Sequence, residues 1–237
     1  MDDLLNSLQG KFKGEVQTAG NVLEKFSIDT SIFRVTPQVV VSPQDSADLQ
    51  TLVSWVASQK KNNSSLSLTA RAAGTDMTGG PLTDSIVVDV MKHFNHIVEI
   101  GPDYVIVEPG VFYRDLEREL DKRNIFFPSY PASKDWCALG GMIANNAGGE
   151  KTLLYGKTDK YISSLQMVLA DGKEYAIEPL DSQKSKSRTT EKTFVGKIYK
   201  SIYELLSTNY DLLKRSRPTV SKNSSGYNVW DVMGKDG

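Results

Sequence analysis

The sequence predicts a mixed α/β (α+β) fold, in which a small parallel βαβ unit precedes an antiparallel-rich part. β-Branched runs on either side of an amphipathic segment predict strand, helix and parallel strand. Farther on, short apolar runs joined by turn sequences are typical of antiparallel hairpins. We therefore divide the chain into a helical lead-in (1–35), a first subdomain (36–93) and a second subdomain (94–237).

The first subdomain is predicted from three short runs of β-branched or apolar residues at 39–41, 66–70 and 86–90. Between the first two runs, apolar residues from Leu49 to Ala57 recur at the spacing of one helical face. Ser42 or Asp45 is expected to cap this helix. Because the strands are almost continuously apolar, we expect a parallel sheet that is buried on both faces.

The second subdomain is expected to begin with strands at 97–100 and 104–108, which the turn triplet Gly-Pro-Asp at 101–103 joins. A helix should follow from 113 to 122. Asn124 is expected to end it as a left-handed C-cap, because asparagine tolerates that conformation.

Farther along, Asp171-Gly172 separates two apolar runs at 165–170 and 173–177, which predicts a β-hairpin. Residues 181–192 are polar, with interleaved serines and lysines, and are expected to form a surface loop. An amphipathic helix is predicted from Phe194 to Leu213, because apolar residues recur there at helical spacing.

Composition narrows the classes of protein and partner. The 237 residues are 39% hydrophobic and 24% charged, as in an ordinary globular protein, and the net charge of −1 offers no basic surface for nucleic acid. No apolar run is long enough for a transmembrane helix, and the one cysteine, Cys137, fits a reducing compartment. We expect a cytoplasmic location, with peripheral membrane association as a further option. His93 and His96 lack a third ligand at a suitable spacing, so no metal site is expected.

Two glycine-rich segments carry the main functional signal. The first is Arg71-Ala-Ala-Gly-Thr-Asp-Met-Thr-Gly-Gly80, which follows strand 66–70 directly, and the second is the small-residue stretch 131–149. Both offer backbone N–H groups without Cβ crowding, as a bound phosphate requires. Neither contains the G-x-G-x-x-G pattern of a Rossmann site or a complete P-loop.

The second segment predicts a helix that can lie close to a flat ligand. Small residues recur about once per helical turn at Ala138, Gly141, Ala144 and Gly148. The helix is expected to begin near Gly140-Gly141, and its N-terminus would favour negative charge. Two such segments suggest an elongated anionic ligand that touches both.

Five ordered motifs resemble those of flavoproteins of the vanillyl-alcohol oxidase (PCMH) type. They are Arg-x-x-Gly-Thr…Gly-Gly at 71–80, Val-Glu-Pro-Gly at 107–110, the stretch 131–149 with its Leu-Gly-Gly and Asn-Ala-x-Gly, Tyr155-Gly156, and Leu-Ala-Asp-Gly at 169–172. Within this type, the sequence is most similar to the branch of FAD-linked oxidases that contains glycolate oxidase and D-lactate dehydrogenase. The segment 222–228 resembles the stretch before that family's last flavin-contacting loop.

The resemblance implies a two-subdomain FAD-binding fold and an enzyme that oxidises a 2-hydroxy acid, such as D-lactate, glycolate or D-2-hydroxyglutarate, by hydride transfer to flavin N5. It implies a small-molecule substrate and an electron-acceptor protein or quinone as partner. It assigns cofactor contacts to Arg71, Ala72, Ala73, Gly74, Thr75, Asp76, Met77, Thr78, Val107, Gly110, Pro131, Ser133, Leu139, Gly140, Gly141, Asn145 and Gly148. Within this set, residues 72–78 hold the diphosphate, and Val107 and Gly110 lie toward the adenosine.

Two departures from the family pattern shape the expectation. Thr75 stands where many relatives attach the flavin through a histidine, so FAD is expected to be non-covalent. The chain also ends before the family's next glycine-rich loop and capping domain. We therefore expect a C-terminally truncated chain that is inactive alone, and we assign no catalytic base. Two alternatives stay open: an NADPH-dependent flavin reductase of cell-wall precursor synthesis, and a non-catalytic flavin-binding fragment.

Overall fold

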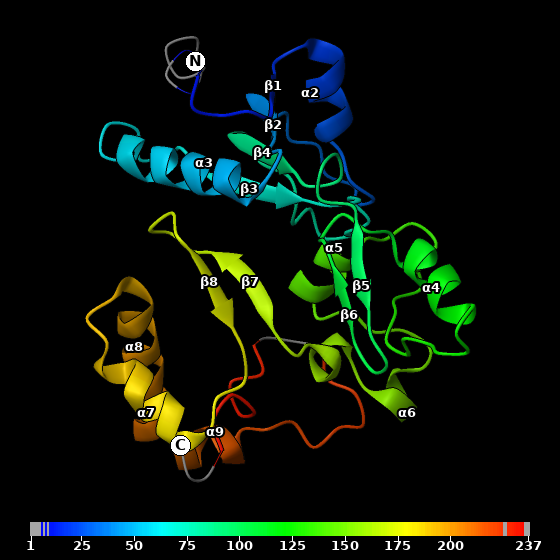
Figure 1. Ribbon diagram of the computed structural model, residues 1–237, viewed down its shortest axis with the longest axis vertical. Coiled ribbons are helices and arrows are strands. Elements are labelled where there is room, and N and C mark those ends of the chain that lie inside the picture. Colours follow the sequence, from blue (N-terminus) through cyan, green and yellow to red (C-terminus); the bar gives the residue numbers. More distant parts are fainter. Residues whose placement is uncertain (1–5, 7, 9, 225–226, 235–237) are drawn as a thin grey trace. The chain divides into compact units, whose positions relative to one another are not determined.

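The computed structural model describes residues 6, 8, 10–224 and 227–234 (Figure 1). Helices combine with parallel and antiparallel strands, as expected for the predicted class. The chain forms two compact units. The first holds the described residues up to Ile162 together with Val168–Glu174, and the second holds Ser163–Met167 and the described residues from Tyr175 onward. The boundary expected between residues 93 and 94 lies inside the first unit.

The first unit begins with a four-stranded sheet. Its elements are β1 (Glu15–Gln17), α2 (Gly20–Phe26), β2 (Val39–Ser42), α3 (Ser46–Gln59), β3 (Leu68–Arg71) and β4 (Ile86–Asp89). The strand order is β1-β2-β4-β3, and both β2 and β3 run parallel to β4. This confirms the predicted βαβ unit with α3 as its crossover. The lead-in differs from the expected helix, because it contributes the antiparallel edge strand β1 as well as α2.

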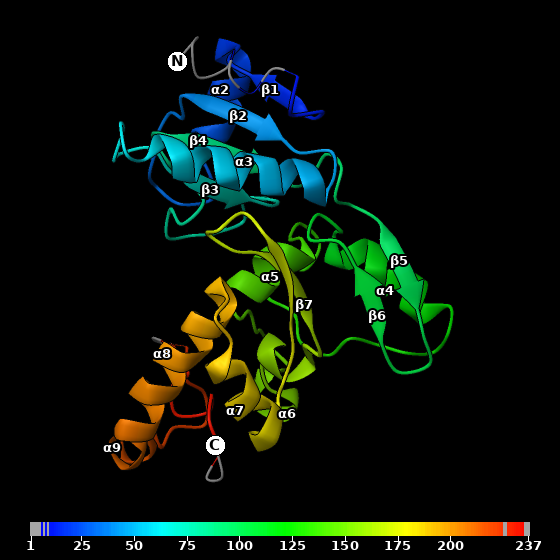
Figure 2. The same cartoon turned by 60° about the vertical axis from the view of Figure 1, so that its left-hand side comes forward.

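Both faces of this sheet are covered (Figures 1 and 2). Val39 and Val41 of β2 share a buried cluster with Leu52 of α3. Val40, between them, packs instead with Phe26 of α2. Successive side chains of a strand point to opposite faces, so α3 covers one face and α2 covers the other.

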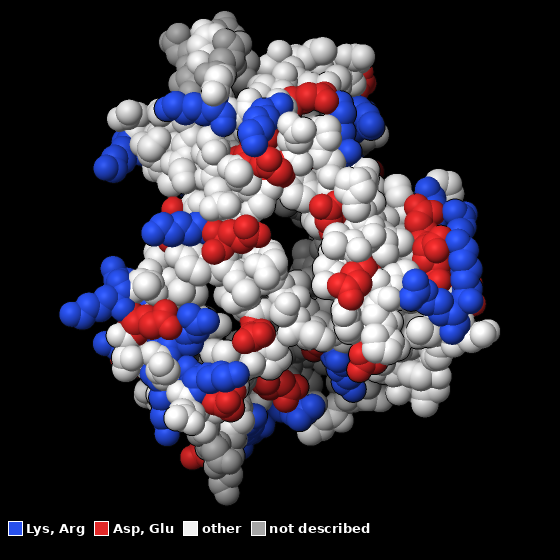
Figure 3. All heavy atoms as spheres, in the orientation of Figure 1, with Lys and Arg blue, Asp and Glu red and all other residues white. Residues whose placement is uncertain are grey.

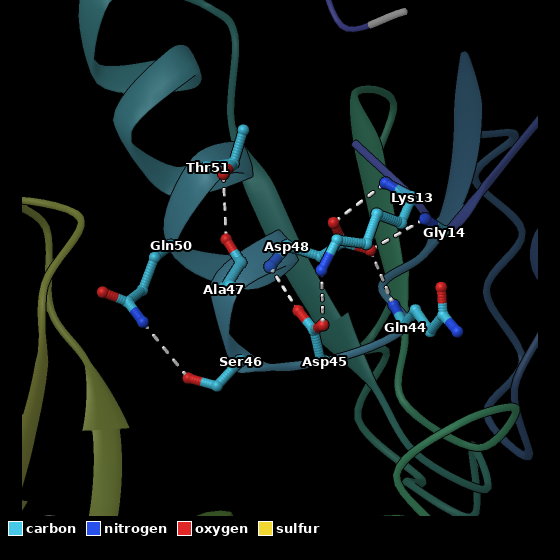
Figure 4. A network of polar contacts seen from close by, with 9 residues as sticks. All are labelled: Lys13, Gly14, Gln44, Asp45, Ser46, Ala47, Asp48, Gln50 and Thr51. Atoms are coloured by element: carbon cyan, nitrogen blue, oxygen red, sulfur yellow. Dashed lines mark hydrogen bonds and ion pairs between the residues drawn. The ribbon is translucent and has the colours of Figure 1, made fainter. Parts of the chain in front are cut away.

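A buried carboxylate joins the lead-in to the start of α3 (Figure 4). Asp48 is 1% exposed, and its carboxylate accepts hydrogen bonds from the backbone N–H groups of Lys13 (2.9 Å), Gly14 (2.7 Å) and Gln44 (3.0 Å). Of the two expected capping residues, Asp45 is the N-cap, since its side chain accepts from the Asp48 N–H at 2.8 Å. These bonds fix the residues that lead into β1.

The remainder of the first unit surrounds a second core. Its elements are β5 (Ile97–Ile100), β6 (Val105–Val107), α4 (Tyr113–Asp121), α5 (Leu139–Ala144), α6 (Thr152–Tyr155) and the 3₁₀ turn η1 (Thr158–Tyr161). β5 and β6 pair antiparallel as predicted, and Asn124 adopts the predicted left-handed conformation with φ 55°. Tyr113 and Leu116 of α4 pack with Leu139 and Met142 of α5 in a buried cluster distinct from those of the first sheet.

The last elements are the hairpin β7 (Leu165–Val168) and β8 (Glu174–Ile177), followed by α7 (Ser182–Thr190), α8 (Phe194–Thr208) and α9 (Tyr210–Arg215). The hairpin is confirmed, and Gly172 adopts φ 75° in its turn. The surface loop expected at 181–192 is wrong, because Asp181 accepts from the Lys184 N–H at 2.7 Å and caps α7. The helix expected to run on to Leu213 is interrupted at Asn209, which is not helical.

Within the described part of the chain, no helix combines the length and the apolar character that crossing a membrane would need. Lys and Arg side chains lie among Asp and Glu on the face displayed in Figure 3, consistent with the net charge of −1. Of the stretch 222–228 that resembles the flavoprotein family, Ser225 and Gly226 lie outside the described residues.

Candidate functional site

The first glycine segment leaves the end of β3 as an irregular, mostly half-buried loop with a row of backbone donors. Six successive backbone N–H groups, from Ala72 to Met77, donate to no acceptor among the described residues. Gly74 adopts φ 70°, a left-handed conformation that favours glycine. Backbone donors without a protein partner need water or a ligand, and successive N–H groups in such a turn are suited to an anion.

Asp76 organises the far end of this loop. Its carboxylate accepts from the Thr78 N–H (2.5 Å), the Thr78 hydroxyl (2.7 Å) and the Gly80 N–H (3.3 Å). Partial burial would raise the pKa of the Asp76 carboxyl, but these hydrogen bonds outweigh it and hold the pKa below its ordinary value. The carboxylate is thus engaged by the loop itself, and a role for Asp76 in binding would fall to its backbone.

The second glycine segment is joined to the turn after β6. The N–H of Gly140 donates to the carbonyl of Pro109 at 2.8 Å, and the N–H of Leu139 donates to Val111 at 2.9 Å. A Cβ at Gly140 would lie 2.6 Å from the Cβ of Pro109, so this approach requires glycine. Gly110 is similarly confined, because its Cβ would lie 2.6 Å from the carbonyl oxygen of Phe94. The structure therefore brings the Val-Glu-Pro-Gly motif against the start of α5.

α5 presents one buried and one nearly bare face. Leu139 and Met142 are buried in the second core, whereas Gly141, Ala144 and Asn145 are exposed. A Cβ at Gly141 would lie 3.9 Å from the Cβ of Ala72, so the two glycine segments meet at this helix.

The predicted stripe of small residues is shorter than expected. Ala138 is 1% exposed and bridges to Phe112, so it belongs to the core. Gly148 lies beyond the end of α5 at Ala144, where a Cβ would meet the Thr152 hydroxyl at 2.5 Å. Only Gly141 and Ala144 remain as small residues on the exposed face of the helix.

The rest of the second segment consists of hydrogen-bonded turns. The carbonyl of Pro131 accepts from Lys134, and the carbonyl of Ser133 accepts from Trp136 and Cys137. Thr158 is a buried residue that supports this segment and that the sequence did not reveal. It is 1% exposed, and both its N–H (3.0 Å) and its hydroxyl (2.8 Å) donate to the carbonyl of Ala147. Its only signal in the sequence is the run Gly156-Lys-Thr158, which has the residues of a P-loop ending and indicates a different kind of site.

Several residues named from the sequence have contacts within the protein. Val107 packs against the second core, and Cys137 is buried among its apolar side chains, where burial raises the pKa of the thiol to about 11. His96 pairs with Glu108 and His93 with Glu15. Within the described ranges, no group of three or more His, Cys, Asp or Glu side chains is arranged to hold a metal ion.

This geometry suits a long ligand with an anionic middle and a flat end. The unpaired N–H groups of the first segment match a diphosphate, and the side-chain-poor face of α5 leaves room for a ring system beside them. FAD has both features, so the residues present fit this cofactor. Fold and site together define a flavin-dinucleotide-binding class of protein.

Comparison with known proteins identifies the family. Residues 37–177 match the FAD binding domain family, and the chain belongs to it. FAD is therefore the cofactor of this domain, as the sequence predicted. The alkyldihydroxyacetonephosphate synthase structure shares the fold, with a TM-score of 0.64 at 16% identity over 76% of this chain and 35% of that one.

Curated relatives are longer than this chain. D-2-hydroxyglutarate dehydrogenase of Escherichia coli (strain K12) is 31% identical over 95% of this chain and 22% of its own length. Glycolate oxidase subunit GlcD of Bacillus subtilis is 30% identical over 60% of this chain and 30% of its own length. D-lactate dehydrogenase of Archaeoglobus fulgidus is 32% identical over 57% and 30%, respectively. The chain thus spans less than a third of each of these relatives.

Proposed function

We propose that this domain holds FAD for an oxidoreductase that oxidises a 2-hydroxy acid, with D-2-hydroxyglutarate, D-lactate and glycolate as candidate substrates. The names of the relatives support this substrate class. The observation that carries the proposal is the meeting of Ala72 and Gly141, which places the unpaired N–H groups beside the bare face of α5.

Each part of the site has a distinct task in this proposal. The N–H groups of Ala72–Met77 bind the diphosphate, and the exposed residues Gly141, Ala144 and Asn145 lie along the flavin end. Bound FAD would supply the acceptor for the hydride that leaves the hydroxyl-bearing carbon of the substrate. The roles of Val107, Gly110, Pro131 and Ser133 in contacting the cofactor remain predictions.

Titration of the 237-residue chain with FAD tests the cofactor site. We expect quenching of flavin fluorescence that saturates, and competition by ADP, because ADP carries the same diphosphate. Thr75 carries no imidazole for covalent attachment, so acid precipitation should leave all the flavin in the supernatant. Absence of both flavin binding and ADP competition would refute the proposed site, and flavin retained in the pellet would refute the non-covalent mode.

Substrate class is tested on the whole protein that contains this domain. Anaerobic addition of D-2-hydroxyglutarate, D-lactate or glycolate should bleach the visible absorbance of the oxidised flavin. Bleaching by NADPH but by none of these acids would instead support the reductase alternative. An electron-acceptor protein or a quinone is the proposed partner, and addition of a soluble quinone analogue should then restore the absorbance. The cytoplasmic location is likewise proposed, and cell fractionation would test it.

A further inference from the structure

The segment Phe26–Arg34 contacts the first glycine segment at three places. The guanidinium of Arg71 donates to the carbonyl of Phe26 at 3.3 Å and lies 5.3 Å from the centre of its ring. The hydroxyl of Thr30 donates to the carbonyl of Asp76 at 2.7 Å. At the far end of the loop, a Cβ at Gly79 would lie 3.1 Å from the ring of Phe33. The segment precedes residue 37, where the family match begins.

The contacting segment has a defined conformation of its own. Ile28 and Arg34 form an antiparallel bridge, and the Val35 N–H donates to the carbonyl of Ser27 at 2.9 Å. Inside this bridge, the carboxylate of Asp29 accepts from the Ser31 N–H at 2.8 Å. These bonds make Phe26–Arg34 a preformed support for the loop that it touches.

Arg71 fills the space beneath the left-handed turn of the loop. It is 9% exposed, and a Cβ at Gly74 would lie 2.4 Å from its guanidinium. Burial lowers the pKa of Arg71, while the carboxylates of Asp29 and Asp89 oppose this effect. The Arg71 side chain therefore packs against the turn at Gly74, within the row of unpaired N–H groups.

The Thr30 bond fixes the direction of one of these donors. The carbonyl of Asp76 and the N–H of Met77 belong to the same planar peptide unit and point in opposite directions. Because Thr30 holds the Asp76 carbonyl, the Met77 N–H must point away from the segment Phe26–Arg34. A donor fixed before binding costs less conformational entropy when the anion arrives.

We propose that Thr30 is a positioning residue for FAD, acting through the Asp76–Met77 peptide as part of a clamp formed by Phe26–Arg34. This inference rests on the proposed diphosphate site at Ala72–Met77. It goes beyond the family match, because the clamp lies outside the matched residues. It also gives the lead-in a role in cofactor affinity.

The test compares three variants of the 237-residue chain. Thr30→Val removes the hydroxyl and keeps the side-chain shape, and Thr30→Ser restores the hydroxyl. Thr51→Val is the matched control, because the Thr51 hydroxyl also donates to a backbone carbonyl, that of Ala47 at 2.9 Å, in α3. The measurements are the FAD dissociation constant, the melting temperature without FAD, and the ¹⁵N order parameter of the Met77 amide.

Thr30→Val should raise the FAD dissociation constant about fivefold, the equivalent of one ordinary hydrogen bond. The Met77 amide should become more mobile without FAD, while Thr30→Ser and Thr51→Val match the wild type in both measurements. Equal FAD affinity in Thr30→Val and wild type would overturn the clamp, as would a lower melting temperature with an unchanged Met77 order parameter. If the wild type binds no FAD, the proposed function fails. The clamp is then judged by the Met77 order parameter alone, and an unchanged order parameter in Thr30→Val overturns the clamp.

Discussion

Replacing the neighbouring glycines of α5 by alanine should produce effects of opposite sign. Gly141 lies on the exposed face, and a Cβ there would make only an ordinary contact, 3.9 Å from the Cβ of Ala72. Alanine is favoured over glycine inside a helix by about 0.5–1 kcal/mol. We therefore expect Gly141→Ala to raise the free energy of unfolding by up to this amount.

The same methyl group should weaken FAD binding. It would project from the bare face of α5 beside Ala72, where the flavin is proposed to lie. An added methyl group in a filled space costs about 1–3 kcal/mol, which corresponds to a loss of affinity of about 5- to 150-fold. A substitution that stabilises the fold and weakens binding identifies a ligand surface and not a core position.

Gly140→Ala should instead destabilise the fold. Its Cβ would lie 2.6 Å from the Cβ of Pro109 and 2.9 Å from the Pro109 carbonyl oxygen. The strain of about 1–3 kcal/mol exceeds the gain in helix propensity, so the free energy of unfolding should fall. Gly20→Ala in α2 is the control, because a Cβ there has no neighbour within 4 Å.

Urea unfolding of the FAD-free chain measures the stability of each variant, and titration with FAD by fluorescence measures its affinity. Gly20→Ala should bind FAD like the wild type. Wild-type FAD affinity in Gly141→Ala would show that the flavin does not approach this face, and would refute the arrangement proposed for the site. An unfolding free energy for Gly140→Ala equal to that of the wild type would refute the close approach of Pro109.

Three further predictions concern single side chains. Asp48→Ala should lower the free energy of unfolding by about 3–5 kcal/mol in urea, because three backbone donors lose a carboxylate partner. Cys137 should resist a thiol reagent at mildly alkaline pH in the folded chain and react after unfolding, since it is 3% exposed with a pKa raised to about 11; equal rates would contradict its burial. The pKa of Asp76 is lowered on folding, so its contribution to stability is present above the ordinary value of 3.8 and is lost as the pH falls through the folded pKa. The difference in melting temperature between wild type and Asp76→Ala should therefore shrink below about pH 3.8, and a constant difference down to about pH 2.5 would argue against the Asp76 turn.

The sequence predicted the first sheet well because its signals are local. The continuous β-branched run of β2, which is buried on both faces, and the apolar spacing of α3 are each visible within a few consecutive residues. Asn124 and Gly172 were predictable for a similar reason, since each occupies a left-handed turn that few other residues adopt. Such features depend on a few neighbouring residues and need no knowledge of the tertiary fold.

Other elements depend on information that apolar spacing does not carry. α7 buries no apolar side chain, so its only helix signal in the sequence is the capping residue Asp181. β1 is three residues long, and the two residues just before it are held by Asp48, which lies more than thirty positions away along the chain. A polar segment becomes helix or strand in these cases because of one distant or capping carboxylate.

The sequence motifs predicted the residues of the candidate site, but not the residues that hold the site's backbone in place. Ala72 and Gly141 belong to motifs that the family resemblance supplied, and the structure brings them together. Thr30 and Thr158 act through hydroxyl bonds to backbone carbonyls 46 and 11 positions away. Single threonines of this kind carry no pattern in the sequence, since their meaning depends on the carbonyl that they meet.

The edge strand β1 has a consequence for how this domain should be cut from a longer protein. β2 consists of Val-Val-Val-Ser, is buried along its whole length, and pairs with β4 on one side and β1 on the other. A chain begun at residue 37, where the family match starts, would leave one side of this valine-rich strand without a partner. Open strand edges of this kind promote association between copies. We therefore expect the lead-in to protect this sheet edge from aggregation. A preparation that begins before Lys13 should remain monodisperse, whereas one that begins at residue 37 should precipitate.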